Sequence, residues 1–307
     1  MVMIMQLRRK VKIANRKGAI GLLYISLWLV GFLVFQLYPF VSSFVFSFTD
    51  YSLLKTPKFV GLDNYYYMFF KDPLFWKSLW VTSVYVFFSV PAKLVFALLI
   101  ALVLAMKLKG ISIFRTIYYI PSIMGGSVAI AILWKVLFDT NGIINQMLFY
   151  LSIGPINWLG SPDVALYTIG LLTVWQFGSS MVIFLAGLKQ IPEELYEAAK
   201  IDGASGFRIF FNITVPMLTP IIFFNLIMQM VNAFQDFTGA LVITKGGPLN
   251  STYLYALKLY DDGFKFFKMG YASALSWVLF IIIMLLTSLV FKSSSSWVHY
   301  DDGGKTV

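Results

Sequence analysis

The chain has 307 residues, of which 59% are hydrophobic and only 12% are charged, and its net charge is +10. Soluble domains have about 25% charged residues, so this chain has too few to cover a surface that faces water. The composition excludes an ordinary soluble protein and predicts an integral membrane protein. Cysteine is absent, which excludes disulfide bonds and thiolate metal sites.

Basic residues cluster just before the first apolar run. The positive-inside rule places such clusters in the cytoplasm, so we expect residues 1–19 to form a basic cytoplasmic N-terminus. Anionic lipid head groups are a second attraction for these side chains. Topology explains them better than a nucleic-acid partner does. The cluster consists of Arg8, Arg9, Lys10, Lys12, Arg16 and Lys17.

Six runs are apolar and long enough to cross a bilayer as a helix, which takes about 20 residues. The first run is too long for a signal peptide and no small-residue cleavage site follows it, so we expect it to stay in the membrane. The pattern predicts an all-α membrane protein with one six-helix domain at 20–291 and a polar cytoplasmic tail at 292–307. The runs lie at 20–46, 79–106, 114–138, 164–187, 209–233 and 271–291.

With six spans, both termini and the loop 189–208 lie on the cytoplasmic side. The loop 139–163 on the outer side has no Lys or Arg, as the positive-inside rule requires. The outer loop 234–270 runs against the rule, which longer loops obey only weakly. Its basic residues are Lys245, Lys258, Lys265 and Lys268.

The chain lacks the residue patterns of a catalyst. It has no phosphate-binding loop of the G-x-x-x-x-G-K-[ST] type and no nucleophile with a histidine partner. Its single histidine, His299, lies in the polar tail, where we expect it to be solvated. We therefore expect no catalytic residue, cofactor or metal site in this chain, and expect it to move or hold a solute.

An unusual polar segment lies between the fourth and fifth apolar runs, LKQIPEELYEAAKIDGASGFRIFFNITVPMLTP at 188–220. From Pro192 to Ala199 its residues favour a helix, with Pro192 suited to the first turn. Gly203 and Gly206 then permit a sharp change of direction. We expect a second helix to start near Phe207 and to enter the membrane.

This segment resembles the signature loop of permeases of binding-protein-dependent ABC importers. The pattern is E-A-A, three residues, G, nine residues and I-x-L-P, and valine replaces leucine here. Other stretches are similar to the carbohydrate-uptake branch, including the maltose and glycerol-phosphate permeases: FTDY at 48–51, FVGLDNY at 59–65, YIP at 119–121 and LVITKGGP at 241–248. The matching residues of the loop are Glu197, Ala198, Ala199, Gly203, Ile213, Val215 and Pro216.

The resemblance implies a type I ABC importer permease fold with a cytoplasmic coupling helix between helices 4 and 5. It implies a bacterial cell membrane protein that imports a sugar, and the branch favours an oligosaccharide, by alternating access. The implied partners are a second homologous permease, an extracellular sugar-binding protein and two ABC ATPase subunits that bind ATP and Mg. The implied ATPase-coupling residues are Glu197, Ala198, Ala199, Asp202 and Gly203.

Polar side chains at membrane depth usually face a cavity, and the fifth run has several. Asn225, Gln229, Asn232 and Asp236 follow steps of four, three and four, which predict one helix face. Amides beside an aromatic ring suit sugar hydroxyls and a pyranose face, although hydrogen bonds between helices use the same residues. By resemblance to the maltose permease, Trp175, Gln176 and Asn232 have the strongest claims. The predicted path also includes Ser179 and Gln235.

Lys93 lies in the middle of the second run, where a charged side chain costs about 3 kcal/mol. One interpretation is a structural partner, such as backbone carbonyls freed near Pro91. The other is that Lys93 lines the path and favours an acidic saccharide.

Two other classes of protein remain as alternatives to the importer subunit. A secondary transporter for a polar solute needs ion-coupling carboxylates near the midplane, and Asp236 alone comes close. A membrane-embedded enzyme lacks a visible nucleophile or metal ligands. A requirement for an ATPase and an external binding protein would separate the importer subunit from both.

Overall fold

The computed structural model describes residues 24–52, 55–106 and 109–299. The basic N-terminal cluster and the end of the polar tail, 300–307, lie outside these ranges. Within the ranges the chain is helical, and its extended pairings are two isolated bridges, Thr49 with Phe59 and Ser52 with Lys55. The all-α prediction is therefore confirmed.

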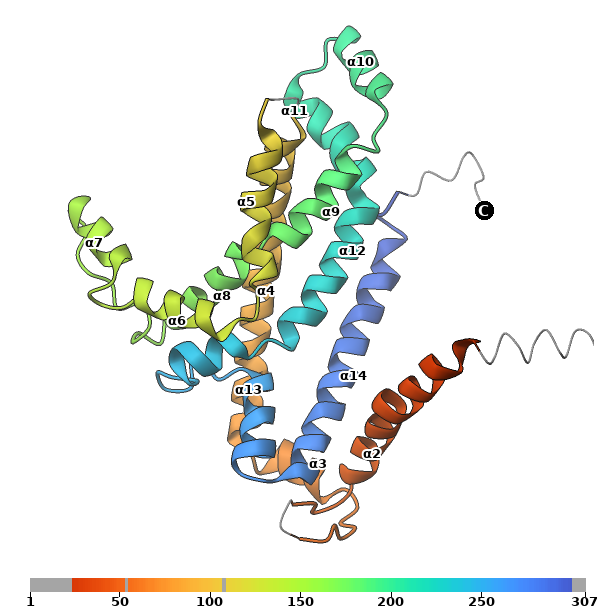
Figure 1. The fold of residues 1–307 in the computed structure, drawn as a ribbon, viewed down its shortest axis with the longest axis vertical. Helices are drawn as coiled ribbons and strands as arrows, with labels where there is room; N and C mark the ends of the chain where they lie inside the picture. The colour runs from red at the N-terminus through yellow and green to blue at the C-terminus, as the bar shows by residue number, and fades with distance from the viewer. Residues whose placement is uncertain (1–23, 53–54, 107–108, 300–307) are drawn as a thin grey trace, which may run out of the picture. The chain divides into compact units, whose positions relative to one another are not determined.

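Figure 1 shows the helices in chain order from red to blue. π-Helical turns lie at Leu33–Leu37, Phe210–Thr214, Ala240–Thr244 and Asp261–Lys265. In chain order the helices are α2 (Tyr38–Phe46), α3 (Asp63–Phe70), α4 (Pro73–Ala105), α5 (Ile111–Ile123), α6 (Val128–Leu137), α7 (Ile143–Tyr150), α8 (Ala165–Trp175), α9 (Gly178–Leu188), α10 (Glu193–Ile201), α11 (Gly206–Ile209), α12 (Val215–Phe234), α13 (Tyr255–Tyr260) and α14 (Met269–Ser294).

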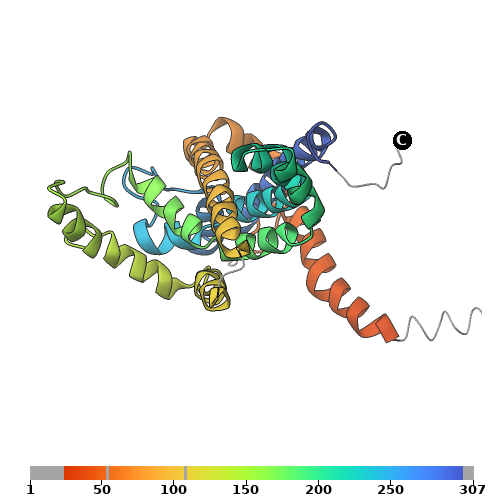
Figure 2. The ribbon, with the colours of Figure 1, turned by 90° about the horizontal axis from the view of Figure 1, so that it is seen from above.

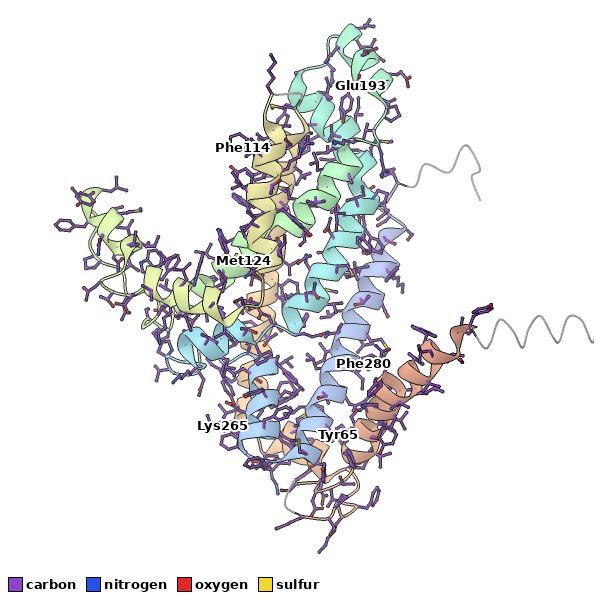
Figure 3. All side chains as sticks on the ribbon, in the orientation of Figure 1. Tyr65, Phe114, Met124, Glu193, Lys265 and Phe280 are labelled. Atoms are coloured by element: carbon purple, nitrogen blue, oxygen red, sulfur yellow. The ribbon has the colours of Figure 1, made fainter. Side chains whose placement is uncertain are left out.

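Four helical segments of the described chain are long and apolar enough to cross a membrane unbroken. The third and fourth predicted runs are instead bent pairs, α5 with α6 at 102° and α8 with α9 at 46°. Counting each pair as one span gives the predicted six. Met124 and Gly125 lie at the first bend (Figure 3). Mean hydropathy over a whole span does not register such breaks, because a few residues change the average only slightly. The unbroken segments are Tyr24–Phe46, Pro73–Ala105, Gly206–Phe234 and Met269–Ser294.

The second span begins six residues before its predicted start at 79. Asp72 is the N-cap of α4, and its carboxylate accepts a hydrogen bond from the Leu74 N–H at 2.9 Å. Pro73 follows at the first helical position, where its missing N–H costs nothing. A cap followed by proline therefore sets the start of the helix, although the most apolar stretch begins later.

The chain divides into two compact units, Met1–Tyr66 with Asp262–Trp277 and Tyr67–Asp261 with Val278–Val307. In the first unit, the Trp277 ring packs against Phe40 at 4.7 Å and Phe44 at 4.8 Å between centroids. The Val60 N–H donates to the Phe48 carbonyl at 2.8 Å. This bond joins the FTDY and FVGLDNY stretches.

Helix α4 is the central element of the second unit and contacts α5, α8, α9, α12 and α13. Most of its residues are apolar, as expected of a helix that is buried or in a membrane. Polar side chains nevertheless recur on it at steps of three and four, which place them on one face. The buried residues of this face are Phe75, Ser78, Thr82, Tyr85, Ser89 and Lys93.

Candidate substrate path and coupling segment

Helix α10, the predicted coupling helix, begins one residue later than expected. Pro192 is its N-cap, with φ −57° and ψ 132°, so it stands just outside the helix instead of in the first turn. Glu193 and Glu194 occupy the first turn, where carboxylates interact favourably with the helix dipole. Figure 3 shows Glu193 at the start of this helix.

A Schellman motif ends α10 at the predicted glycine. Gly203 adopts φ +72°, a left-handed conformation that a residue with a Cβ resists. Its N–H donates to the Lys200 carbonyl at 3.1 Å, and the Ala204 N–H donates to the Ala199 carbonyl at 2.9 Å. These two bonds satisfy carbonyls that the end of the helix leaves without partners. Glycine at 203 is thus required by the turn.

The second predicted helix of this segment begins near its expected start. The Ser205 hydroxyl accepts a hydrogen bond from the Arg208 N–H at 3.4 Å and caps α11. Helix α11 starts at Gly206, one residue before Phe207. It continues through a π-helical turn into α12, which has Pro216 in its first turn.

The residues of the predicted coupling signature lie largely at the surface. Glu197, Ala198, Asp202 and Gly203 are exposed, and Ala199 is half-buried. A cavity of about 700 Å³ lies between α10 and the ends of α4 and α5, and its lining includes Arg115. The Tyr196 hydroxyl lies 3.2 Å from the Thr214 hydroxyl and connects α10 to the base of α12. The helix therefore stands away from the spans and presents its signature residues to the surroundings.

The two bent spans meet at their breaks. The Ser122 hydroxyl of α5 donates to the Gln176 carbonyl at 3.0 Å and accepts from the Ser179 N–H at 2.9 Å. A Cβ at Gly178 would lie 2.5 Å from the Tyr118 carbonyl oxygen, so only glycine allows α5 to come this close. Irregular backbone at membrane depth is tolerated where it is buried in protein or lines a cavity. The structure therefore places Gln176 and Ser179 at such a break.

Trp175 lies on the helix that ends at this break. Its ring is partly exposed and lies 6.0 Å from the ring of Trp134 on α6. The Gln176 side-chain oxygen lies 3.3 Å from the Cβ position of Gly125, at the bend between α5 and α6. The aromatic and amide groups predicted for the path therefore lie together between the two bends.

A partly buried polar cluster joins α4, α8 and the end of α12. The Tyr85 hydroxyl donates to the Asp236 carboxylate at 2.6 Å and lies 2.7 Å from the Thr173 hydroxyl. Thr173 lies 3.4 Å from the same carboxylate. Lys93 is buried on the same face of α4 and interacts electrostatically with Asp236. The structure thus brings Lys93 and Asp236 into one cluster.

Two members of this cluster, Tyr85 and Thr173, were not predicted from the sequence. The spacing of Tyr85, Ser89 and Lys93, two steps of four on one helix face, is a signal that could have identified Tyr85. Thr173 carries no such signal, because a threonine in an apolar helix is common and its contact with Asp236 depends on the tertiary structure.

The predicted polar face of α12 divides into two parts. Asn225 and Gln229 are buried, and the Asn225 amide atoms make no hydrogen bond within the described residues. Asn232 and Gln235 are exposed. Helix α12 ends at Phe234, so Gln235 is its C-cap and Asp236 lies beyond the helix. The part of the face near Asn232 is therefore the accessible part.

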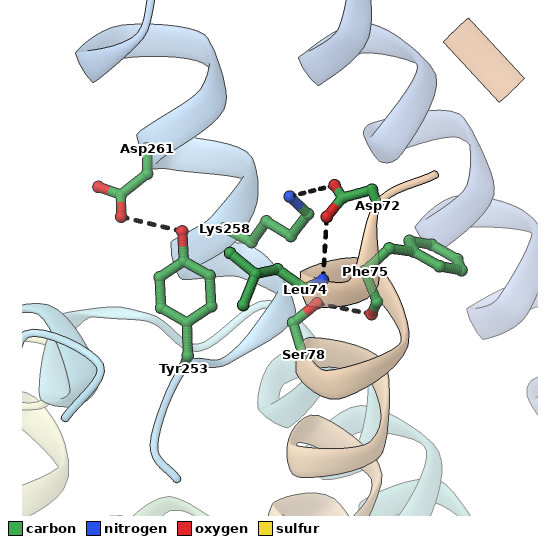
Figure 4. A network of polar contacts seen from close by, with 7 residues as sticks. All are labelled: Asp72, Leu74, Phe75, Ser78, Tyr253, Lys258 and Asp261. Carbon is green, nitrogen blue, oxygen red and sulfur yellow. Dashed lines mark hydrogen bonds and ion pairs between the residues drawn. The ribbon is translucent and has the colours of Figure 1, made fainter. Parts of the chain in front are cut away.

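A second buried polar network fastens α13 to the start of α4, and we call it the α4–α13 clamp (Figure 4). The Lys258 ammonium lies 2.6 Å from the Asp72 carboxylate, with the two side chains 4% and 9% exposed. The Tyr255 N–H donates to the Thr82 hydroxyl at 2.7 Å, and the Tyr253 hydroxyl donates to Asp261 at 3.1 Å.

The surroundings of the clamp are strongly desolvated. Burial raises the pKa of the Tyr255 hydroxyl, and the charge of Asp72 raises it further. Lys258 is also one of the lysines of the loop 234–270, which is predicted to lie on the outer side. Its charge is compensated inside the protein, which explains how it is tolerated there.

Comparison with known proteins identifies the family. The chain belongs to the binding-protein-dependent transport system inner membrane components, whose family model matches residues 69–299. The probable ABC transporter permease protein YesP of Bacillus subtilis (strain 168) is 50% identical over 95% of this chain and 96% of its own. The arabinooligosaccharides transport system permease protein AraP of the same organism is 33% identical over 92% and 90%.

A solved structure shares the fold. A bacterial ABC transporter involved in the import of the acidic polysaccharide alginate includes a chain with a TM-score of 0.79. It covers 92% of this chain and 98% of its own at 20% identity, so the likeness concerns the fold. The predicted family and the predicted type I permease fold are confirmed.

Proposed function

We propose that this chain is the membrane-spanning subunit of an ATP-driven importer of oligosaccharides. It forms half of the translocation path, and a second homologous permease forms the other half. An extracellular sugar-binding protein delivers the substrate, and two cytoplasmic ABC ATPase subunits bind ATP and Mg. Both termini and α10 lie in the cytoplasm of a bacterial cell. Family membership and the sugar-transport name of a relative that matches nearly the whole chain support this proposal.

The observation that carries the coupling role is the exposed signature on α10. Glu197 and Ala198 lie on a helix that projects from the spans and connects to α12 through Tyr196 and Thr214. An ATPase subunit that binds this helix can therefore pull on a membrane-spanning helix. Each ligand then biases a two-state membrane element through its different contacts in the two states.

Glu197→Lys tests this role. We expect the variant to insert and fold normally, to lose most ATP-dependent sugar uptake in proteoliposomes, and to bind its ATPase subunits weakly. Glu194→Lys is the matched control, because Glu194 is an equally exposed carboxylate on the same helix. Normal uptake with normal ATPase co-purification in Glu197→Lys would contradict the coupling role.

The proposed substrate path runs past the two bends and the end of α12. Trp175 supplies an aromatic plate, and Gln176, Ser179, Asn232 and Gln235 supply groups that suit sugar hydroxyls. Gln229 is buried on α12, which favours a hydrogen bond between helices for this residue. We expect Trp175→Ala to weaken uptake severalfold through a higher KM while ATPase coupling persists. An unchanged KM for every transported saccharide would argue against this path.

Lys93 and Asp236 support a second, finer proposal about the substrate. A buried ammonium on the path would favour a uronate-bearing saccharide, whereas an ammonium engaged by Asp236, with which it interacts electrostatically, would have a structural role. Uptake of neutral and uronate oligosaccharides by Lys93→Gln separates these roles. If Lys93 selects an acidic sugar, the variant loses more uptake of uronate oligosaccharides than of neutral ones. Equal losses of uptake would reject this role.

The mode of energy supply distinguishes the importer subunit from a secondary transporter. We expect uptake in proteoliposomes to require ATP on the side of α10 and the binding protein on the other side. Uptake by this permease alone, driven by an ion gradient, would overturn the proposed function.

A further inference from the structure

The segment that joins α6 to α8 has an unusual surface. From Thr140 to Pro162 it contains no charged residue, and Asp139 and Asp163 flank it. Around the C-terminal end of α7, the side chains of Phe149, Tyr150 and Leu151 are 75%, 86% and 69% exposed. Figures 1 and 2 both show α6 and α7 extending away from α5, so this end of α7 projects from the helices around α4.

Asn145 organises this segment as a rigid element. Its amide nitrogen donates to the carbonyls of Thr140 and Ile156, both at 2.9 Å. Its amide oxygen accepts from the Ile156 N–H at 3.1 Å and from the Trp158 ring N–H at 2.9 Å. One buried side chain therefore ties the start of α7 to the returning chain. The exposed apolar end is presented on a defined scaffold.

Trp158 anchors this scaffold to the two neighbouring spans. Its ring packs against Phe138 after α6, at 5.5 Å between centroids. Its carbonyl accepts from the Thr168 hydroxyl of α8 at 3.2 Å, and the Thr168 carbonyl accepts from the Trp134 ring at 2.9 Å. The direction of α7 is therefore set by the ends of both spans.

Polar and apolar groups lie on different parts of this segment. Asn141 and Gln146 are exposed, and the Gln146 amide donates to the Asn141 carbonyl at 3.0 Å. The aromatic residues lie at the other end of α7, where the left-handed Ser152 (φ 59°) ends the helix. Amphipathic aromatic rings such as that of tyrosine concentrate between head groups and acyl chains, and the amides at the other end of the helix can remain hydrated, so this segment matches that interface.

We infer that α7 rests in the interfacial layer of the bilayer, with Phe149, Tyr150 and Leu151 inserted among the lipids. Three observations favour lipid as the occupant. The segment continues directly from two membrane spans, it has no charge with which to select a protein partner, and aromatic side chains dominate its projecting end. An anchored α7 would hold the far end of α6 at the membrane surface while α5, across the 102° bend, stays free to move.

The absence of cysteine from this chain makes the inference directly testable, because a single introduced cysteine is the only one that the chain carries. Partner subunits without cysteine complete the importer, so the label lies at one known place. Nitroxide labels are attached to Phe149→Cys and Tyr150→Cys in the assembled importer. The importer is reconstituted in vesicles of phosphatidylethanolamine and phosphatidylglycerol. Collisions with oxygen, which concentrates in lipid, are compared with collisions with a water-soluble nickel complex. Asn141→Cys, at the amide end, is the matched control.

We expect oxygen collisions to dominate at 149 and 150 and nickel collisions to dominate at 141. Nickel-dominated collisions at 149 and 150 would overturn the inference and show a surface open to water or to the binding protein. Protection from both reagents would also overturn it, because a second protein, such as the other permease, would then cover this face. If either variant fails to assemble, Leu151→Cys provides the same reading from the adjoining turn.

Discussion

The predicted coupling segment, residues 189–208, and the α4–α13 clamp use charged side chains in opposite ways. In the coupling segment, Glu197 and Asp202 lie on the surface. In the clamp, Lys258 and Asp72 are almost fully buried and compensate each other at 2.6 Å. The coupling segment keeps its charges in water. The clamp removes its charges from water, at a cost in desolvation free energy, and the ion pair holds two helices together.

The difference indicates which contacts are internal and which await a partner. A buried ion pair that loses one member leaves an uncompensated charge, so its removal affects the fold. An exposed carboxylate contributes little to the stability of its own chain. Substitutions in the clamp should therefore lower the stability of the permease, whereas substitutions in the coupling segment should leave stability intact and lower transport.

The largest expected effect is in the clamp. Lys258→Met leaves Asp72 buried without its counter-charge, which should cost about 3–5 kcal/mol and sharply lower the melting temperature of the purified permease. Adding Asp72→Asn should recover part of the loss, because asparagine is neutral and still caps α4. Lys245→Met, which removes an exposed lysine, is the control. Equal melting temperatures for Lys258→Met and Lys245→Met would contradict a stabilising clamp.

Tyr85→Phe tests whether one residue of α4 affects both the stability of the permease and its transport. It removes the hydroxyl that donates to Asp236, a hydrogen bond to a charged group worth about 1.5–3 kcal/mol. We expect both a lower melting temperature and a change in the KM for sugar, because the Tyr85 side chain is buried and its cluster adjoins the proposed path. Tyr119→Phe, at an exposed position, should change neither. A change in melting alone would assign the cluster to stability only.

Gly203→Ala should affect transport without affecting the whole fold. A left-handed conformation costs a residue with a Cβ about 1–2 kcal/mol, and the strain falls on the end of α10. We expect uptake to fall severalfold while melting is unchanged. Gly203→Asn should keep more activity, because asparagine tolerates this conformation better. If alanine and asparagine behave identically, the Schellman turn is not what sets the activity.

The smallest expected effect is at the connection between α10 and α12. Tyr196→Phe removes one hydroxyl contact, worth about 0.5–1.5 kcal/mol. We expect a modest loss of sugar uptake per ATP hydrolysed, with binding of the ATPase unchanged. Measured uptake and hydrolysis in the same proteoliposomes give this ratio. An unchanged ratio would show that the contact does not transmit force.

Much of the coupling segment was predictable because its determinants are local. Glutamates after Pro192, small residues at 198 and 199, and glycine at 203 are the residues that start, fill and end a short helix. The exception was Pro192 itself, which suits both the N-cap and the first turn, so composition alone misplaced it by one residue. The polar face of α12 was predicted as one unit, yet Asn225 is buried and Asn232 exposed. Periodicity states which side chains share a face but not what covers each part of it.

The sequence by itself determined the six apolar runs of a membrane protein and the short helix between the fourth and fifth runs, because hydropathy and helix signals act over neighbouring residues. Tertiary structure decided that two of the six runs are bent and meet at their bends. It also decided that Lys258 pairs with Asp72 and that Asp236 joins Tyr85, Thr173 and Lys93. These contacts link residues far apart in the chain, and their free energies depend on burial that only the packed helices create.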